Sequence, residues 1–174
     1  MTSRPDTTKL GPDLEISRIL TGLWQIADIE KDGTPVDLDA AAGHLADYAA
    51  AGFTTFDMAD HYGNAELVAG RLLARHGEGE GRPLAFTKWC PEPGPMTEEV
   101  VRAGVQERLD RLGVACVDLL QFHWWTFEHP GWLDALKHLA KLREEGLIRE
   151  IGVTNFDAGH LRVALAENLP IVSN

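Results

Sequence analysis

The sequence is poor in the features that mark membrane, secreted and nucleic-acid-binding proteins. It holds two cysteines, Cys90 and Cys116, among 174 residues, and no apolar run approaches the roughly 18 residues that a membrane-spanning helix needs. The first fifteen residues, MTSRPDTTKLGPDLE, lack the apolar stretch of a secretory signal. A formal net charge of -11 leaves no excess of Lys and Arg for nucleic acid or anionic lipid. We therefore expect a cytoplasmic protein with reduced thiols and with neither nucleic acid nor a membrane as partner.

Two kinds of catalytic motif are also missing. The seven histidines are scattered singly, with no H-x-H or H-E-x-x-H pair, so a metal-dependent hydrolase is poorly supported and no metal site is predicted. The first expected strand is followed by Trp24-Gln25-Ile26-Ala27-Asp28, where a doubly wound dinucleotide-binding fold would show the turn G-x-G-x-x-G.

What is present is a repeat of short strand-like runs and longer helical segments. With 44% apolar and 25% charged residues, the chain has enough apolar material for one domain with one core, and we expect residues 1–174 to form it. Strands alternating with helices indicate βα units with a parallel sheet. The six predicted strands are Arg18–Leu23, Thr54–Met58, Leu84–Lys88, Val117–Phe122, Ile148–Val153 and Ile171–Ser173.

Five helices are predicted between these strands from their caps and apolar stripes. Asp37, Asn64, Thr97 and Asp157 are good residues to begin a helix, and Gly52 and Gly146 are good residues to end one. The inward-facing stripes are Leu38, Ala41, Leu45 and Tyr48; Ala65, Val68, Leu72 and Leu73; Val101, Val105, Leu109 and Leu112; Trp132, Leu136, Leu139 and Leu142; and Leu161 with Leu165.

This repeat suits either an open doubly wound sheet or a closed eight-stranded barrel. The absence of the glycine-rich turn favours the barrel, a TIM-type β/α fold. Eight βα units need about 250 residues, whereas 174 residues hold about five units and a sixth strand. The sequence therefore predicts an incomplete β/α barrel whose C-terminal part is missing.

Polar residues stand at the ends of four successive predicted strands. Asp57 ends the second, Lys88 the third and His123 the fourth, while Thr154 and Asn155 follow the fifth. In a β/α barrel these ends meet around one mouth, where active sites are built. Tyr62 lies on the loop after the second strand and would join them.

Each of these residues also has an ordinary structural explanation. Asp57 could be a turn or capping residue, His123 a core histidine bonded to a carbonyl, and Tyr62 a buried aromatic whose hydroxyl finds a partner. Lys88 is harder to explain in this way, because an ammonium between Phe86 and Trp89 needs a compensating charge. Asp57, one strand away, is its expected partner, and the whole set is more informative than any member.

An Asp–Lys pair beside a tyrosine would have a chemical purpose. A phenol has an ordinary pKa of about 10, and a neighbouring ammonium favours the phenolate. We therefore expect Lys88 to lower the pKa of Tyr62 and make it a general acid. His123 would orient a substrate oxygen or relay a proton. The hydroxyl of Thr154 and the amide of Asn155 suit a neutral carboxamide.

At these residues the sequence resembles the aldo/keto reductase family. Phe56-Asp57-Met58-Ala59-Asp60-His61-Tyr62-Gly63 is similar to the segment in which an Asp is followed five residues later by the catalytic Tyr. Thr87-Lys88-Trp89 is similar to the family's lysine strand, and Leu119-Leu120-Gln121-Phe122-His123-Trp124 to its histidine strand. Ile151-Gly152-Val153-Thr154-Asn155-Phe156 is similar to its I-G-[V/A]-[S/T]-N-F segment. The resemblance runs from about Ile16 to the last residue.

The resemblance implies an oxidoreductase that moves a hydride between NADP(H) or NAD(H) and an aldehyde, ketone or alcohol. Tyr62 would be the acid, Lys88 and Asp57 would tune it, and His123 would place the carbonyl. Asp57, Thr154 and Asn155 would also contact the cofactor, and Gly22 and Trp24 would line its pocket.

The chain departs from the family at Met58, where a small residue or Thr is common, and at Trp125, where Pro is common. Members also continue into two further βα units that grip the cofactor's phosphates. An unclosed barrel leaves the edges of its first and sixth strands free. We therefore expect a chain that is marginally stable or self-associates through its open edge. The alternative function is a noncatalytic binding or regulatory module, since the family also contains channel-associated subunits.

Overall fold

The fold centres on one parallel sheet whose strands follow one another in chain order. The computed structural model describes residues 4–12, 14–26, 34–77, 79 and 81–174. Within them, the sheet has six strands in the order β3-β4-β5-β6-β7-β8, each parallel to its neighbours. Their bounds are β3 Thr21–Gly22, β4 Thr55–Asp57, β5 Leu84–Trp89, β6 Val117–His123, β7 Ile148–Thr154 and β8 Ile171–Ser173. The predicted parallel order is confirmed.

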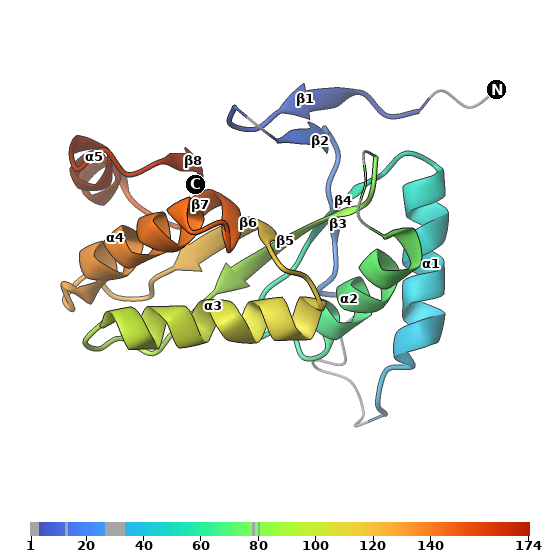
Figure 1. Ribbon diagram of the computed structural model, residues 1–174, viewed down its shortest axis with the longest axis horizontal. Coiled ribbons are helices and arrows are strands. Elements are labelled where there is room, and N and C mark those ends of the chain that lie inside the picture. The colour runs from blue at the N-terminus through green and yellow to red at the C-terminus, as the bar shows by residue number, and fades with distance from the viewer. Residues whose placement is uncertain (1–3, 13, 27–33, 78, 80) are drawn as a thin grey trace.

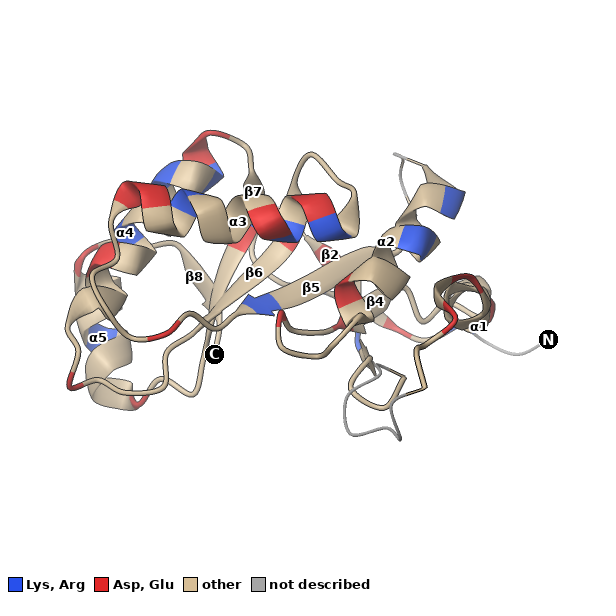
Figure 2. Ribbon diagram, turned by 90° about the horizontal axis from the view of Figure 1, so that it is seen from below, with Lys and Arg blue, Asp and Glu red and all other residues tan. Residues whose placement is uncertain are grey.

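Five helices connect these strands and cover the outside of the sheet (Figure 1). They are α1 Leu38–Ala50, α2 Ala65–His76, α3 Glu98–Leu112, α4 Gly131–Glu144 and α5 Ala158–Ala166. Figure 2 shows their charged residues concentrated on the helices, while the strands carry few. At the interface between α3 and the sheet, Gly104 faces Trp89 so closely that a Cβ atom would collide with the indole ring. No helix in the described ranges is long and apolar enough to cross a membrane.

Caps predicted from the sequence are present. Asp37 accepts hydrogen bonds from the backbone of Asp39 and Ala40, and Asp157 does the same for Gly159 and His160. The side chain of Thr97 accepts from the Val100 amide. Asn64 occupies the N-cap position of α2.

Two residues of the predicted apolar stripes are exposed. Tyr48 on α1 is 52% exposed and Leu165 on α5 is 50% exposed. These helices lie at the two ends of the sheet, next to its edge strands β3 and β8. Within the described residues no further βα unit covers Tyr48 or Leu165, so the apolar stripe of each helix is wider than the surface that the helix packs against.

An N-terminal hairpin was not predicted. Its strands β1 Thr7–Lys9 and β2 Glu15–Ser17 pair antiparallel and form a separate sheet. The predicted strand Arg18–Leu23 is correspondingly wrong in its extent, because only Thr21–Gly22 pairs with β4. Leu14 and Ile16 pack against Leu84, Phe86 and Leu119, so the hairpin covers the amino ends of the central strands.

Candidate active site

The strand register brings the predicted polar residues to one end of the sheet. Gly22 lies beside Asp57, and His123 lies beside Thr154. Lys88, on the central strand β5, lies beside Gln121 of β6. The carboxyl ends of these strands, with the loops that follow, form what we call the mouth. All parallel strands of such a sheet end on the same side, so residues as far apart in the chain as Gly22 and Thr154 converge there.

An ion pair forms the centre of the mouth. The Lys88 ammonium donates to both carboxylate oxygens of Asp57, at 2.9 and 2.7 Å, and to the Met58 carbonyl oxygen at 3.0 Å. The Lys88 side chain is only 12% exposed, and the predicted compensating charge is therefore present. Gln121 donates to the same Asp57 carboxylate at 3.0 Å. Its role was missed, although it lies two positions before His123 and so shares that residue's face of β6.

Tyr62 lies beside this ion pair. The Lys88 nitrogen is 5.4 Å from the centre of the Tyr62 ring. The Trp24 ring meets the Tyr62 ring edge-on, with 4.7 Å between the ring centres. The expected lowering of the Tyr62 pKa does not occur. Burial, followed by the negative charges of Asp57 and Asp60, raises the pKa of Tyr62 above its ordinary value. Burial disfavours the phenolate, and Asp57 also pairs with the ammonium that was expected to stabilise it.

His123 is buried at the mouth, with 6% of its surface exposed. Among the described residues, neither of its ring nitrogens has a hydrogen-bond partner. Burial, then the nearby charges of His61 and Lys88, lower the pKa of His123, which keeps the ring neutral at pH 7. A neutral imidazole with one free donor and one free acceptor can bind a ligand oxygen.

Further polar atoms at the mouth are buried and unpartnered in the described part of the chain. They are the hydroxyl oxygens of Thr154 and Ser173. The Ser173 hydroxyl lies so close to β7 that a Cβ atom at Gly152 would collide with it. Asn155 is exposed and has a φ of 60°, a left-handed conformation that asparagine tolerates better than most residues. Gly22 is exposed and borders open space. These groups are the predicted cofactor contacts and their neighbours.

The loop that carries Tyr62 is fixed by a buried charge network that the sequence reasoning did not identify. Glu66 has no exposed surface and binds Arg108 at 3.0 Å, Arg111 at 2.7 Å and the Thr87 hydroxyl at 2.6 Å. Burial raises the pKa of Glu66, and the two arginines act against that shift. Arg108 also approaches Asp60 at 3.6 Å. The arginines of α3 therefore tie helix α2 and the Tyr62 loop together.

The known proteins that this chain resembles agree with one another. The family model of the aldo/keto reductase family matches residues 18–174. The chain belongs to the aldo/keto reductase family. An aldo-keto reductase of Mycobacterium sp. (strain KMS) is 36% identical over 151 residues, which cover 86% of this chain and 50% of that protein. One from Mycolicibacterium smegmatis is 32% identical over 153 residues, covering 87% and 50%. The chain thus spans about half the length of the curated relatives it matches.

Solved aldo/keto reductases share the fold. A thermostable member in complex with the inhibitor epalrestat has a TM-score of 0.80 at 29% identity, covering 95% of this chain and 60% of that one. The glycerol dehydrogenase of Gluconobacter oxydans has a TM-score of 0.75 at 28% identity, covering 96% and 53%. A Bombyx mori aldo-keto reductase in complex with NADP matches at 20% identity with a TM-score of 0.76, covering 98% and 57%, a likeness of fold alone. The predicted incomplete β/α barrel is confirmed.

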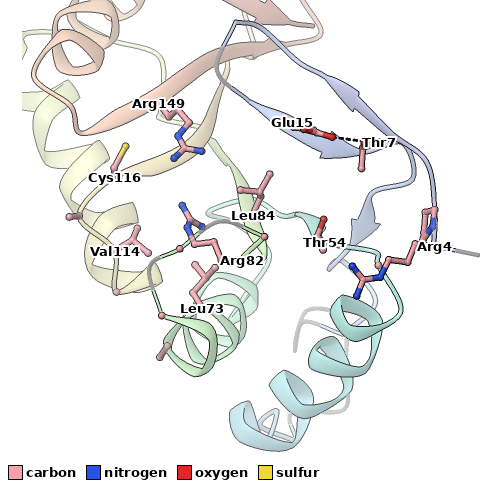
Figure 3. A pocket seen from close by; sticks show the side chains of 18 residues that line it. Arg4, Thr7, Glu15, Thr54, Leu73, Arg82, Leu84, Val114, Cys116 and Arg149 are labelled. Carbon is pink, nitrogen blue, oxygen red and sulfur yellow. Dashed lines mark hydrogen bonds between the residues drawn. The ribbon is translucent and has the colours of Figure 1, made fainter.

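Two hollows in the described part of this aldo/keto reductase chain lie away from Tyr62. One, of about 900 Å³, lies at the amino ends of the strands and is lined by Thr54, Leu84, Cys116 and Arg149, with the hairpin opposite (Figure 3). The other, of about 770 Å³, runs along α1 beside Gly22.

Proposed function

We propose that this chain carries the proton-transfer half of an NADP(H)- or NAD(H)-dependent reduction of an aldehyde or ketone, or of the reverse oxidation of an alcohol. The observation that carries the proposal is the juxtaposition at one mouth of the Asp57–Lys88 ion pair, the Tyr62 phenol and the unpartnered His123 ring. Family membership supports the same reaction class. A small carbonyl or alcohol compound would be the substrate.

Tyr62 is suited to give a proton to a carbonyl oxygen. Its raised pKa keeps the phenol protonated at neutral pH, so the donor is loaded before substrate arrives. The Lys88 ammonium, 5.4 Å from the ring centre, would offset the charge of Asp57, which by itself opposes the negative charge that develops on the phenol oxygen as the proton leaves. His123, being neutral, would donate one hydrogen bond to the same substrate oxygen and fix its orientation.

The mouth offers groups that fit a nicotinamide carboxamide. The buried hydroxyls of Thr154 and Ser173 need partners, and an uncharged amide would satisfy them without a new buried charge. Asn155 follows Thr154 directly and is exposed. Gly22 lies beside Asp57 on the edge strand β3, and Trp24 follows it two residues later. When bound there, the cofactor would supply the hydride, and the protein would position and polarise the carbonyl.

A titration with NADPH and NADH, followed by nicotinamide fluorescence, is the first test. We expect saturable binding and slow turnover of a simple aldehyde. Tyr62→Phe should lower kcat by roughly 100-fold to 10,000-fold, the usual contribution of a positioned acid, and leave cofactor affinity unchanged. Tyr48→Phe is the matched control, because it changes the chain's other tyrosine, which is half-exposed on α1. Equal loss in both variants would count against Tyr62 as the acid.

A second candidate is a noncatalytic module that binds a further copy of the chain through the open sheet. It is favoured by the exposed apolar residues near the two edge strands, Ile19 at 60% and Leu20 at 39% before β3, and Val163 at 45% and Leu165 at 50% on α5. Sedimentation would show a concentration-dependent dimer, and Ile19→Lys should abolish it. A monomer that binds cofactor would exclude this second candidate and leave the reductase as the proposed function. In either case, Cys90 and Cys116 form no disulfide, which suits a reducing cytoplasm.

A further inference from the structure

A second histidine stands at the mouth without a role in the proposed reaction. The His61 ring meets the Tyr62 ring edge-on, with 4.9 Å between their centres, and its centre is 6.4 Å from that of His123. The imidazole of His61 therefore lies next to both groups that would handle the substrate oxygen. Its side chain is 41% exposed, whereas His123 is 6% exposed. Of the two imidazoles, His61 is the one in contact with solvent.

The orientation of this ring is fixed by the residue before it. One carboxylate oxygen of Asp60 accepts from the His61 backbone amide at 2.8 Å and lies 2.9 Å from the ring's Nδ1. The other oxygen accepts from the Cys90 amide at 2.7 Å and lies 3.6 Å from Arg108. Asp60 is thus held from β5 and from α3 at once. A carboxylate at Nδ1 selects the tautomer that carries its proton there and leaves Nε2 for exchange.

The other charged groups of the mouth are poorly placed to exchange protons with water. Lys88 directs its hydrogen bonds to Asp57 and Met58, and its side chain is only 12% exposed. His123 is buried, and the positive charge of His61 is one of the causes that lower its pKa. His61, whose side chain is exposed, is therefore the imidazole placed to exchange protons with water.

We infer that His61, oriented by Asp60, returns protons from solvent to Tyr62 after each turnover. The inference rests on the proposed function. In each reduction, the Tyr62 O–H bond breaks, its proton goes to the carbonyl oxygen, and the hydride comes from the reduced cofactor. The phenolate then takes the Nε2 proton of the His61 imidazolium, and His61 recovers a proton from water or a buffer acid. One carbonyl, one hydride and one solvent proton give one alcohol, so the step balances.

Asp60 and His61 do not touch the substrate in this scheme. His61 acts through Tyr62 and is a relay residue, while Asp60 is a positioning residue. The negative charge of Asp60 also favours the protonated state of Tyr62. Return of the proton is therefore favoured by the same carboxylate that orients the ring delivering it.

Nitrogen NMR of the imidazoles tests the arrangement without any turnover. In the full chain, the neutral form of His61 should carry its proton on Nδ1. In His61→Gln, the pKa of His123 should rise, because a positive neighbour is removed. A proton on Nε2 in neutral His61, or a His123 titration that does not move, would overturn the inference whether or not the chain is active.

Kinetics with imidazole as a rescuing acid tests the relay. We expect His61→Gln to lower kcat by roughly 10-fold, less than the loss expected at Tyr62 itself, with cofactor affinity unchanged. Added imidazole should restore kcat in this variant and leave wild type unaffected. His76→Gln, at the far end of α2, is the control and should behave as wild type.

The outcomes separate the two proposals. If wild type reduces an aldehyde but His61→Gln does so equally well, or loses activity that imidazole cannot restore, the relay is wrong and the proposed function stands. If wild type neither binds cofactor nor turns over, the proposed function fails, and the relay has no reaction to serve. A purely structural histidine would not be replaced by imidazole in solution, so rescue supports the relay specifically.

Discussion

The two ends of the sheet differ in the pairing of their buried polar groups, apart from one oxygen of Glu150 on β7 that has no partner among the described residues. At the amino ends, Asp118 on β6 accepts two hydrogen bonds from Arg82, at 2.9 and 2.6 Å, and one from the Ala85 amide at 3.1 Å. At the mouth, His123 and Thr154 present buried polar atoms that have no partner among the described residues. A protein gains stability by satisfying buried polar groups and forgoes that gain where a ligand is meant to satisfy them.

This contrast predicts which end governs activity and which governs stability. Substitutions at the mouth should reduce turnover more than they reduce the free energy of unfolding. Substitutions at the amino ends should do the reverse. The predictions that follow run from the largest expected effect to the smallest.

Lys88→Met should have the largest effect on activity. Removal of the ammonium leaves the Asp57 carboxylate beside Tyr62 without its counter-charge, which disfavours a developing phenolate. We expect kcat for aldehyde reduction to fall by about 100-fold or more. Unfolding in urea should show a smaller loss of stability than at Asp118, because Asp57 is 31% exposed and keeps its hydrogen bond from Gln121. Full activity in Lys88→Met would contradict the expectation that the mouth governs turnover.

Asp118→Ala should have the largest effect on stability. It leaves the Arg82 guanidinium, 18% exposed, without its bidentate partner. Removing one member of a buried ion pair costs roughly 3 kcal/mol of unfolding free energy. Urea denaturation followed by circular dichroism measures this loss. Cofactor affinity of the folded fraction should be unchanged, and a loss of affinity instead of stability would reverse the contrast between the two ends.

His123 should make the stability of the protein depend on pH. Its pKa in the folded chain lies below the ordinary value of 6.5, so the unfolded chain binds more protons between the two values. The stability that His123 contributes is present above pH 6.5 and is lost as the pH falls through its folded-state pKa. Thermal unfolding measured at a series of pH values should show this loss in wild type. The loss should be smaller in His123→Gln, and an identical pH dependence in both proteins would be evidence against it.

Glu145→Gln should have the smallest effect of the series. Glu145 pairs with Arg102 at 2.7 Å on the helical surface, and this ion pair lowers the pKa of Glu145. Exposed ion pairs are screened by water and salt and contribute little to stability. Unfolding and turnover should both match wild type. A marked loss would show that surface pairs matter more in this open sheet than in a closed barrel.

Local signals in the chain were strong enough to predict most of the fold. Asp37, Thr97 and Asp157 cap helices because their side chains reach amides two or three residues away. The β1–β2 hairpin was missed because β1 is exposed throughout and has no apolar alternation to mark it. The exposure of Tyr48 was missed because a helical stripe shows which face is apolar and not what covers it.

The candidate site was predictable only as a set of residues. The positions of Asp57, Lys88 and His123 at the ends of strands marked these residues as candidates. The proximity of the three residues followed from the parallel order of the strands. The contact of Gln121 with Asp57, the approach of Arg108 to Asp60, and the place of His61 near His123 depend on residues from different strands, loops and helices. No single segment contains that information.

The sequence by itself determined the alternation of strands and helices, the barrel type and the residues that gather at the mouth, because these follow from periodicity, caps and strand ends within short stretches of chain. Only the tertiary structure decided the charge states. The pKa of Tyr62 is raised rather than lowered, because the ring is partly buried and because the negative charges of Asp57 and Asp60 lie nearby, while Asp57 on β4 also pairs with Lys88 on β5. Electrostatic effects depend on distance and burial, which are set when the strands come together.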